Sequence, residues 1–332
     1  MSSLFLDALL CRNLKRPPVW LMRQAGRYMP AYRALREKHT LEELFHNPEL
    51  AVEVTLLPIS LLEVDAAILF SDILVIVEAL GLRVEFPESG GPRIVPAIRT
   101  KEQIYALQML DVRHALAYVF EAIERVKEKL SVPLIGFCGG PFTVATYCID
   151  STSALRWMQE DPMSLHHLLD LLTTLSIAYV QEQVRAGADA IQIFDSWANI
   201  LSEEQFHAFC LPYLRRIVAA LRGLAPVILF CRDSSLRYAA LAELEPACIS
   251  LDGHASLAHL RARIPASIAV QGNISPECLK RSPREIQQSV SHLLDSMRGE
   301  KGFIVNLGHG VLPDTPFENV VHFVRAAKEL KN

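Results

Sequence analysis

A basic surplus and long apolar runs are both missing from this sequence. The 332 residues carry 33 Lys and Arg against 37 Asp and Glu, which gives a formal net charge of −4. A nucleic-acid-binding protein usually shows a basic surplus, so we expect no nucleic-acid partner, and any bound anion must be held by a local basic cluster. No apolar run approaches the roughly 20 residues that a membrane-spanning helix needs. The apolar stretch near residue 7 is interrupted by Asp7 and follows no basic region, so we do not expect it to be a signal peptide.

Paired cysteine motifs are missing as well. The seven cysteines stand at positions 11, 138, 148, 210, 231, 248 and 278, an odd number whose spacings match neither CxxC nor a disulfide scaffold. Reduced, buried thiols in a cytoplasmic protein explain this pattern best. With 51% hydrophobic and 21% charged residues, the composition is that of a globular protein.

No Gly/Ser linker or low-complexity segment divides the chain, so we expect a single domain over residues 1–332. Short apolar runs, several of them β-branched, alternate with longer stretches of helical periodicity. The runs are VWLM (19–22), DAAILF (65–70), PLIGF (133–137), DAIQIF (189–194), PVILF (226–230), ACISL (247–251), SIAVQG (267–272) and FIVNL (303–307). Eight strands alternating with helices predict an α/β fold of the (β/α)₈ TIM-barrel type.

The alternative is a doubly wound open sheet, but no run is followed by GxGxxG or GxxxxGK[ST], so its nucleotide-binding versions lack support. Residues 82–95, LRVEFPESGGPRIV, predict a β-hairpin inserted after the second unit, with its turn between Pro87 and Pro92.

Polar residues follow the predicted strands in order along the chain. They are Arg23, Gln24 and Arg27; Ser71 and Asp72; Gly139, Gly140 and Pro141, with Tyr147 beyond; Asp195 and Ser196; Arg232 and Asp233; Asp252; Gln271 and Asn273; and Gly308, His309 and Gly310. In a barrel all of these strand ends meet at the C-terminal mouth, where active sites are built. The pattern therefore predicts one pocket assembled from segments far apart in the sequence.

The stretch WLMRQAGRYMPAYR (20–33) holds arginines but no Asp or Glu. If this stretch is helical, Arg23 and Arg27 project from one face about one turn apart, and each presents a fork suited to a carboxylate or phosphate. Pairing with an acidic residue from another strand end is the competing interpretation. Arg33 and Arg36 are expected to be solvated, although Arg36 is within reach of a large ligand.

Three further candidates are ambiguous by themselves. Asp72 is either a structural cap or arginine partner, or a site carboxylate that stabilises developing positive charge. His309 stands between two glycines at a strand end, where it can bind a carboxylate or take part in proton transfer near neutral pH.

A Ser196–His309–Asp72 catalytic triad can be assembled on paper, but no GxSxG elbow supports it. We expect no metal site, because HExxH and HxH are absent and Cys231 with His254 would be too few ligands.

Several of these segments resemble the uroporphyrinogen decarboxylase family. PPVWLMRQAGRYMPAYR (17–33) resembles its first signature, and GFCGGPFTVATY (136–147) resembles its second. Further matches in the same order are AAILFSDILVI (66–76), QIFDSWA (192–198), VQGN (270–273) and FIVNLGHGVLPDTP (303–316). The resemblance thus covers nearly the whole chain.

The resemblance implies a cofactor-independent carboxy-lyase, usually a homodimer, acting on a tetrapyrrole substrate. Members of the family convert the four acetate side chains of uroporphyrinogen III to methyl groups, which gives coproporphyrinogen III for haem and chlorophyll. Carried over by position, the substrate-binding residues are Arg23, Gln24, Ala25, Gly26, Arg27, Asp72, Tyr147, Ser196 and His309. Asp72, Arg23 and Tyr147 are the catalytic candidates. Asp72 would face the pyrrole N–H groups, and Arg23 is the candidate proton relay.

This sequence departs from the family's usual pattern at a few places. The loop after Tyr147, CIDSTSALRWM, is shorter than usual, the usual LDW is LDG (251–253), and the usual GNLDP is GNISP (272–276). Two alternatives stay open. A zinc-dependent corrinoid methyltransferase of the same superfamily would need HxC at the fifth strand, where this chain has LFC (229–231). A non-catalytic tetrapyrrole-binding protein would keep the pocket and lose turnover.

Overall fold

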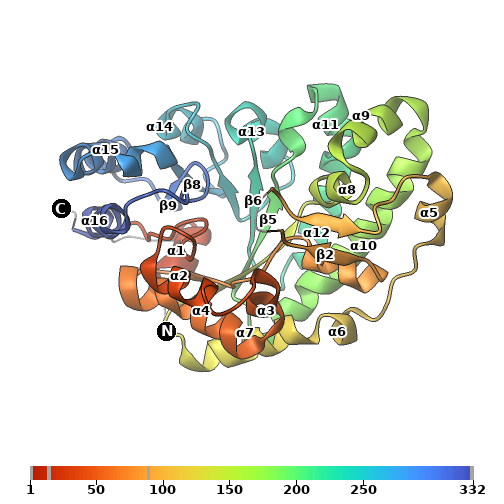
Figure 1. Ribbon diagram of the computed structural model, residues 1–332. Helices are drawn as coiled ribbons and strands as arrows, with labels where there is room; N and C mark the ends of the chain where they lie inside the picture. Colours follow the sequence, from red (N-terminus) through yellow and green to blue (C-terminus); the bar gives the residue numbers. More distant parts are fainter. Residues whose placement is uncertain (1–2, 13–15, 88–89, 330–332) are drawn as a thin grey trace.

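The computed structural model describes residues 3–12, 16–87 and 90–329. A parallel sheet runs through the centre of the molecule with helices around it (Figure 1). In the described part of the chain the sheet has seven strands in the order β1 (Ala67–Ile68), β4 (Leu134–Gly139), β5 (Ala190–Asp195), β6 (Val227–Cys231), β7 (Cys248–Ser250), β8 (Ala269–Ile274) and β9 (Phe303–Leu307). Strands β4 and β5 are buried along their whole length, as expected of short apolar runs in a parallel sheet. The predicted alternating α/β fold is confirmed.

The first predicted strand, at 19–22, is wrong as a full strand. Only Val19 forms a bridge, parallel to Val305 of β9. The amide of Val305 donates to Pro18 O (2.9 Å), and the amide of Asp65, just before β1, donates to Val19 O (2.8 Å). This segment therefore lies between the two edges of the sheet, and it leaves the extended conformation at once because the chain turns at Met22 and Arg23.

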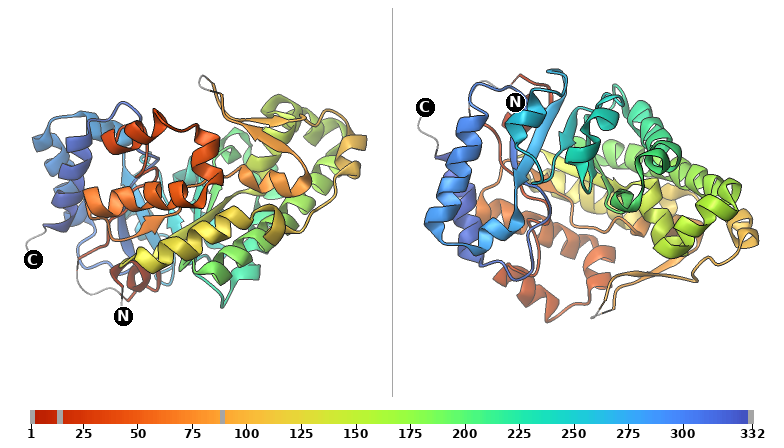
Figure 2. Two further views of the ribbon diagram at one scale, coloured as in Figure 1. Left: turned by 60° about the horizontal axis from the view of Figure 1, so that its bottom comes forward. Right: turned by 90° about the horizontal axis from the view of Figure 1, so that it is seen from above.

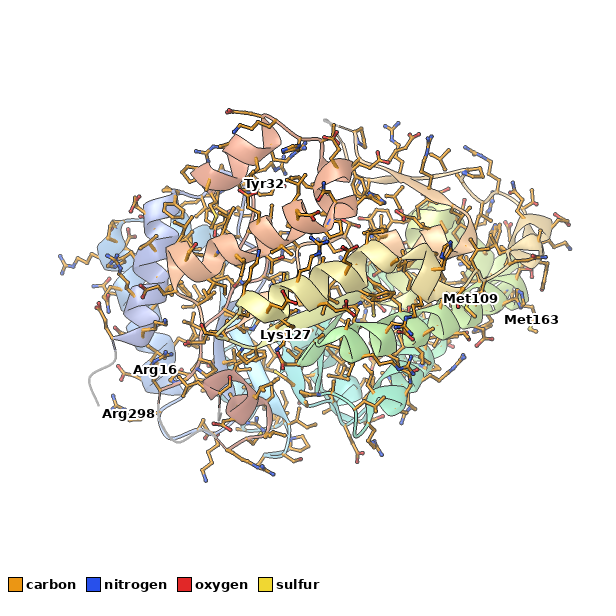
Figure 3. The ribbon with its side chains drawn as sticks, turned by 90° about the horizontal axis from the view of Figure 1, so that it is seen from below. Arg16, Tyr32, Met109, Lys127, Met163 and Arg298 are labelled. Carbon is orange, nitrogen blue, oxygen red and sulfur yellow. The ribbon has the colours of Figure 1, made fainter. Side chains whose placement is uncertain are left out.

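Helices surround the sheet on its outer side, and α4, α7 and α10 pack beside one another (Figures 2 and 3). The helices up to β4 are α1 (Leu4–Leu9), α2 (Pro30–Arg36), α3 (Leu41–His46), α4 (Pro48–Leu62), the 3-10 helix η1 (Val75–Leu80), α5 (Lys101–Ala106), α6 (Val112–Ala115) and α7 (Ala117–Lys129). From β4 to β6 they are α8 (Pro141–Ile149), α9 (Ser151–Glu160), α10 (Pro162–Ala186), η2 (Ala198–Ile200), α11 (Glu203–Phe209) and α12 (Leu211–Leu221). The remaining ones are α13 (Ser234–Ala242), α14 (Leu257–Arg261), η3 (Pro276–Lys280), α15 (Pro283–Ser296) and α16 (Phe317–Lys328).

Local sequence signals set several helix starts. Thr40, Thr100, Ser202 and Ser282 form capping boxes, in which the side chain of the cap and that of the Glu or Gln three residues on each accept a backbone N–H of the other. Proline occupies the first helical position of α4, α8, α10 and α15, where its missing N–H costs no hydrogen bond. Within the described residues, no helix has both the length and the apolar character needed to cross a membrane.

A separate two-stranded antiparallel sheet stands where a hairpin is predicted. Strand β2 (Arg83–Glu85) pairs with β3 (Arg93–Val95), with Val84 opposite Ile94. Residues 88–89 of the predicted turn lie outside the described part of the chain, so the hairpin stays a prediction.

The inner face of the curled sheet has an apolar layer at its N-terminal end. It is formed by Trp20, Ala66, Ile135, Ala190, Ile228, Cys248, Ala269 and Ile304, packed against Phe5, Ala8 and Leu9 of α1. One layer higher, the inner face turns polar: Trp20 Nε1 donates to Gln271 Oε1 (3.1 Å), and Gln271 Nε2 donates to Gln192 Oε1 (3.2 Å). Helix α1 thus covers one end of the inner space, and the ligand-accessible end lies at the C-terminal edge of the strands.

Candidate active site

A cavity of about 370 Å³ opens at the C-terminal edge of the sheet. Its wall combines charged or hydroxyl groups with aromatic and aliphatic ones, an arrangement typical of ligand sites. The lining residues are Met22, Arg23, Gln24, Ala25, Ile68, Leu69, Phe70, Ser71, Asp72, Ile73, Leu74, Pro92, Phe137, Tyr147, Phe194, Ser196, Trp197, Arg232 and His309. Seven of the residues predicted from the sequence to form the site therefore line this cavity together: Arg23, Gln24, Ala25, Asp72, Tyr147, Ser196 and His309.

The chain around Arg23 is a turn, so the condition under which Arg23 and Arg27 would share one face of a helix is not met. Arg23 has φ of 61°, in the left-handed region, and α2 begins only at Pro30. The side chain of Gln24 holds this turn: its Oε1 accepts the amide of Leu21 (3.2 Å), and its Nε2 donates to Ala66 O (3.1 Å). Gln24 is thus buried and committed to the backbone, and the turn directs Arg23 into the cavity.

The other two members of the RQAGR motif do not line the cavity. Gly26 and Arg27 lie beyond its wall, and the Arg27 side chain is exposed. Burial lowers the pKa of Arg23 and the charge of Asp72 opposes this, while repulsion from Arg232 and, more weakly, from Arg27 adds to the lowering. Arg27 and Gly26 therefore stay predictions as substrate-binding residues.

Asp72 lines the same cavity as Arg23 and Arg232, and one of its carboxylate oxygens already accepts a hydrogen bond. Its Oδ1 accepts the amide of Leu74 (2.8 Å), just before η1. Among the described residues it forms no ion pair within 4.0 Å, so the alternative of a carboxylate locked to an arginine is not observed. Burial raises the pKa of Asp72 to about 6, against the lowering effects of the Leu74 amide and the Arg23 charge. The second oxygen is available to a ligand.

Tyr147 of α8 and Trp197 form a neighbouring part of the wall, with their rings edge to face at 6.1 Å between centroids. The loop that carries Ser196 and Trp197 is held from below by Asp195, whose carboxylate accepts the amide (3.0 Å) and hydroxyl of Thr143. The Thr143 hydroxyl in turn accepts the amide of Trp197 (2.9 Å). Asp195 thus supports the wall rather than lining it.

His309 follows β9 and packs edge to face on Phe230, with ring centroids 5.7 Å apart. Burial, Arg23 and Arg232 together lower its pKa to about 4, so the ring is neutral at physiological pH in the free protein. Arg232, which follows β6, also lines the cavity, as the strand-end pattern predicts, although it is not among the residues carried over from the family resemblance. Its position directly after a strand was the available signal, but nothing local distinguished it from a solvated arginine.

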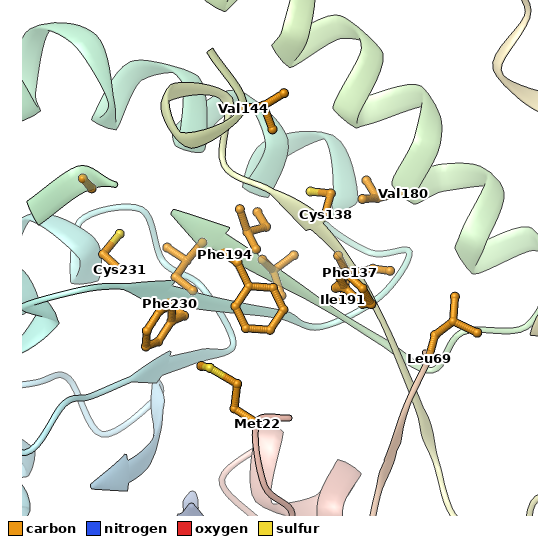
Figure 4. Packing of buried hydrophobic residues seen from close by; sticks show 14 of the residues in the cluster. Met22, Leu69, Phe137, Cys138, Val144, Val180, Ile191, Phe194, Phe230 and Cys231 are labelled. Atoms are coloured by element: carbon orange, nitrogen blue, oxygen red, sulfur yellow. The ribbon is translucent and has the colours of Figure 1, made fainter. Parts of the chain in front are cut away.

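The apolar part of the wall is aromatic. Phe194 packs edge to face against Phe137 (5.6 Å) and Phe230 (5.9 Å), and Figure 4 shows Met22 near the same rings. These residues lie within strands, where the sequence pattern identifies them only as core. Phe137 and Phe194 give part of the cavity wall an apolar, aromatic surface.

No metal-binding cluster of three or more His, Cys, Asp or Glu side chains is found in residues 3–12, 16–87 and 90–329. Cys231 and His254, the pair considered from the sequence, do not converge with a third ligand there.

Comparison with known proteins decides the family. The sequence model of the uroporphyrinogen decarboxylase (URO-D) family matches residues 2–330. The chain belongs to the uroporphyrinogen decarboxylase family. It is 48% identical to the uroporphyrinogen decarboxylase of Protochlamydia amoebophila, over 98% of this chain and 91% of that protein. It is 41% identical to the uroporphyrinogen decarboxylase of Chlorobaculum parvum, over 99% of this chain and 97% of that protein.

Among solved structures, a methyltransferase from Methanosarcina mazei superposes with a TM-score of 0.86 at 24% identity and covers 99% of each chain. At this identity the likeness shows a shared fold alone. The URO-D family assignment rests on the sequence matches, and it agrees with the resemblance in the two signature segments.

Proposed function

We propose that this chain decarboxylates the four acetate side chains of uroporphyrinogen III to give coproporphyrinogen III, as a carboxy-lyase of tetrapyrrole biosynthesis. The observation that carries the proposal is Asp72: a carboxylate with a free oxygen, in a cavity that also holds Arg23, Arg232 and His309. Membership of the URO-D family and the names of the curated relatives support the same reaction.

The cavity suits the chemistry that a pyrrole acetate needs. A proton first adds to the ring carbon next to the acetate, which makes the pyrrole a cationic electron sink. The electrons of the breaking C–CO₂ bond then flow into the ring, and carbon dioxide leaves. A second proton converts the exocyclic methylene to a methyl group while the ring carbon loses the first, so each acetate consumes one proton and releases one carbon dioxide.

The named residues take distinct parts in this sequence. Asp72 accepts the pyrrole N–H groups and stabilises the cation, a preorganised contact worth roughly 3–4 kcal/mol by analogy with oxyanion donors. Arg23 orients a substrate carboxylate and is the proposed proton relay. Tyr147 and Ser196 offer hydroxyl groups on the same wall, and Ala25, Gly26 and Gln24 shape the backbone around Arg23. Arg27, exposed outside the cavity, is proposed to contact an outlying carboxylate.

We also propose the finer architecture and assembly. The segment 19–22, through its bridge at Val19, would take the place of the eighth strand and close a (β/α)₈ barrel. Residues 82–95 would be a hairpin, and the chain would form one domain. Support comes from the bonds of Pro18 and Val19 to both sheet edges. A cytoplasmic homodimer is proposed from family resemblance, and sedimentation of the purified protein tests the dimer.

Anaerobic incubation with uroporphyrinogen III, followed by chromatography of the oxidised porphyrins, tests the function. The tetracarboxylate product supports it. Recovery of bound but unchanged octacarboxylate would instead favour a non-catalytic tetrapyrrole-binding protein. Stoichiometric zinc in the purified protein would revive the corrinoid methyltransferase alternative.

A further inference from the structure

A second cavity of about 430 Å³ adjoins the one described above. It lies between the ends of β6, β7, β8 and β9 and shares two wall residues, Arg232 and His309, with the first cavity. Its other lining residues are Phe230, Asp233, Asp252, Gly253, His254, Ser275, Pro276 and Gly308. Arg232 and His309 therefore lie between the two cavities and line both of them.

The two acidic side chains of the second cavity already have partners. Asp252 accepts the hydroxyl of Ser235 (2.7 Å), the amide of Ser235 (3.1 Å) and the amide of His254 (3.0 Å). Asp233 lies 3.2 Å from His254 Nε2. Neither carboxylate forms an ion pair with Arg232, although Asp233 is its neighbour in the chain.

Arg232 itself is exposed to the cavities and unpaired. Among the described residues its guanidinium forms no hydrogen bond and no ion pair within 4.0 Å. A guanidinium offers five N–H donors in a fork that matches a carboxylate. An arginine whose acidic neighbours are occupied is thus available to an anionic ligand.

The far side of the second cavity is bare backbone. A Cβ on Gly308 would stand 2.7 Å from Gly253 N, so the loops after β7 and β9 approach this closely because residue 308 is glycine. Gly253 is the residue that replaces the tryptophan usual in LDW. With no side chain at either position, this space is not filled by the protein.

We propose that Arg232 binds a carboxylate of the substrate that does not react in that turnover, and that the second cavity receives the side chains at that edge of the macrocycle. This inference rests on the proposed function. The first cavity, at about 370 Å³, lies near the lower end of volumes seen for drug-sized ligands. A macrocycle of four pyrroles with eight acidic arms is larger, so some arms must extend beyond it. Asp72 lines only the first cavity, whereas Arg232 lines both, so Arg232 can bind a carboxylate in the second cavity while the reacting acetate lies at Asp72.

The test separates binding from turnover. Coproporphyrinogen III keeps four propionates and has no acetate to lose, so its dissociation constant, from anaerobic equilibrium dialysis, is independent of catalysis. We expect Arg232→Ala to raise this constant and the KM for uroporphyrinogen III by about 10- to 100-fold, the usual effect of losing one charged hydrogen-bonded contact. The kcat should fall much less than the KM rises, because the reacting acetate is assigned to Asp72 and Arg23, and Arg232 is assigned to a carboxylate that does not react.

Arg232→Lys keeps the positive charge but loses the planar set of N–H donors that a guanidinium offers. Its dissociation constant and KM should lie between those of the wild type and those of Arg232→Ala. The matched control is Arg298→Ala, an exposed arginine just beyond α15 that projects at the edge of the molecule (Figure 3). It should bind coproporphyrinogen III as the wild type does. If Arg232→Ala does not fold, Arg232→Gln decides the same question.

Filling the second cavity gives an independent check. Ser275 is exposed at its rim, so Ser275→Trp should raise the KM and the dissociation constant without touching Arg232. Unchanged binding of coproporphyrinogen III by Arg232→Ala would overturn the inference, and a fall in kcat alone would do the same. A wild-type protein that binds coproporphyrinogen III but releases no carbon dioxide would refute the proposed function and leave the test of Arg232 valid.

Discussion

The side chain of Arg23 lies directly over Gly310. A Cβ on Gly310 would stand 2.5 Å from Arg23 Cδ and 2.8 Å from Cγ, closer than real contacts allow. The loop after β9 is tied to the same turn, because the amide of Val311 donates to Met22 O (3.0 Å). The glycine after His309 thus creates the space that lets Arg23 enter the cavity.

We therefore predict that Gly310→Ala displaces Arg23 and lowers kcat/KM by about 10- to 100-fold, since a misplaced catalytic group loses most of its effect. Gly91→Ala is the matched control, because a Cβ there meets nothing within 4 Å. Steady-state kinetics of both variants check this. Equal activity in the two variants would show that the position of Arg23 does not depend on Gly310.

Asp72→Asn should lower kcat by about 10²- to 10³-fold, as expected when one preorganised charge contact is lost. An amide is neutral and cannot offset the pyrrole cation, although its oxygen can still accept the Leu74 amide. Anaerobic kinetics measure the loss. A kcat near that of the wild type would contradict the role assigned to Asp72.

The same substitution should stabilise the protein at neutral pH. The folded-state pKa of Asp72 is about 6, above the ordinary 3.8, so the folded state binds this proton more tightly than the unfolded state does. That contribution to stability is fully present below pH 3.8 and is lost as the pH rises through 6. The shift corresponds to about 3 kcal/mol.

Chemical denaturation between pH 5 and 8 should show Asp72→Asn gaining stability over the wild type as the pH rises. Asp161→Asn is the control: hydrogen bonds from Ser164 lower the pKa of Asp161, so this carboxyl stays ionised from pH 5 to 8 and the stability lost by the variant should not change with pH in that range. An Asp72→Asn variant whose stability follows the wild type at every pH would show that the carboxyl is not titrating in a buried site.

Thr143→Val should lower the free energy of unfolding by about 1.5–3 kcal/mol, because the buried carboxylate of Asp195 loses a donor. The amide of Trp197 loses its acceptor at the same time, so the wall formed by Ser196 and Trp197 should loosen and the KM should rise. Thr143→Ser keeps the hydroxyl and is the control. Two variants of equal stability would exclude this support for the wall.

The sequence predicts the fold class and most of the cavity because strand ends of a parallel sheet must meet at one edge. Arg23, Asp72, Tyr147, Ser196 and His309 are brought together for that reason. A spacing of four residues could not reveal that the chain at Arg23 is a left-handed turn, because the turn is held by Gln24 bonding to distant Ala66.

Other parts of the site depend on contacts that a sequence does not display. Phe137 and Phe194 lie in apolar strands and look like core, and only the curvature of the sheet shows that their rings face a cavity. Within the described part of the chain, Arg232 is distinguished by having no hydrogen-bond or ion-pair partner, whereas Asp233 and Asp252 are bonded to other groups. The space beside Gly253 likewise appears only in three dimensions.

The most direct test of the account is the stoichiometry of carbon dioxide released per uroporphyrinogen III under anaerobic conditions, measured for the wild type and for Asp72→Asn. We predict four molecules of carbon dioxide and coproporphyrinogen III from the wild type, and a rate about 10²- to 10³-fold lower from the variant. Wild-type protein that releases no carbon dioxide, or an Asp72→Asn variant that releases it at the wild-type rate, would contradict the account.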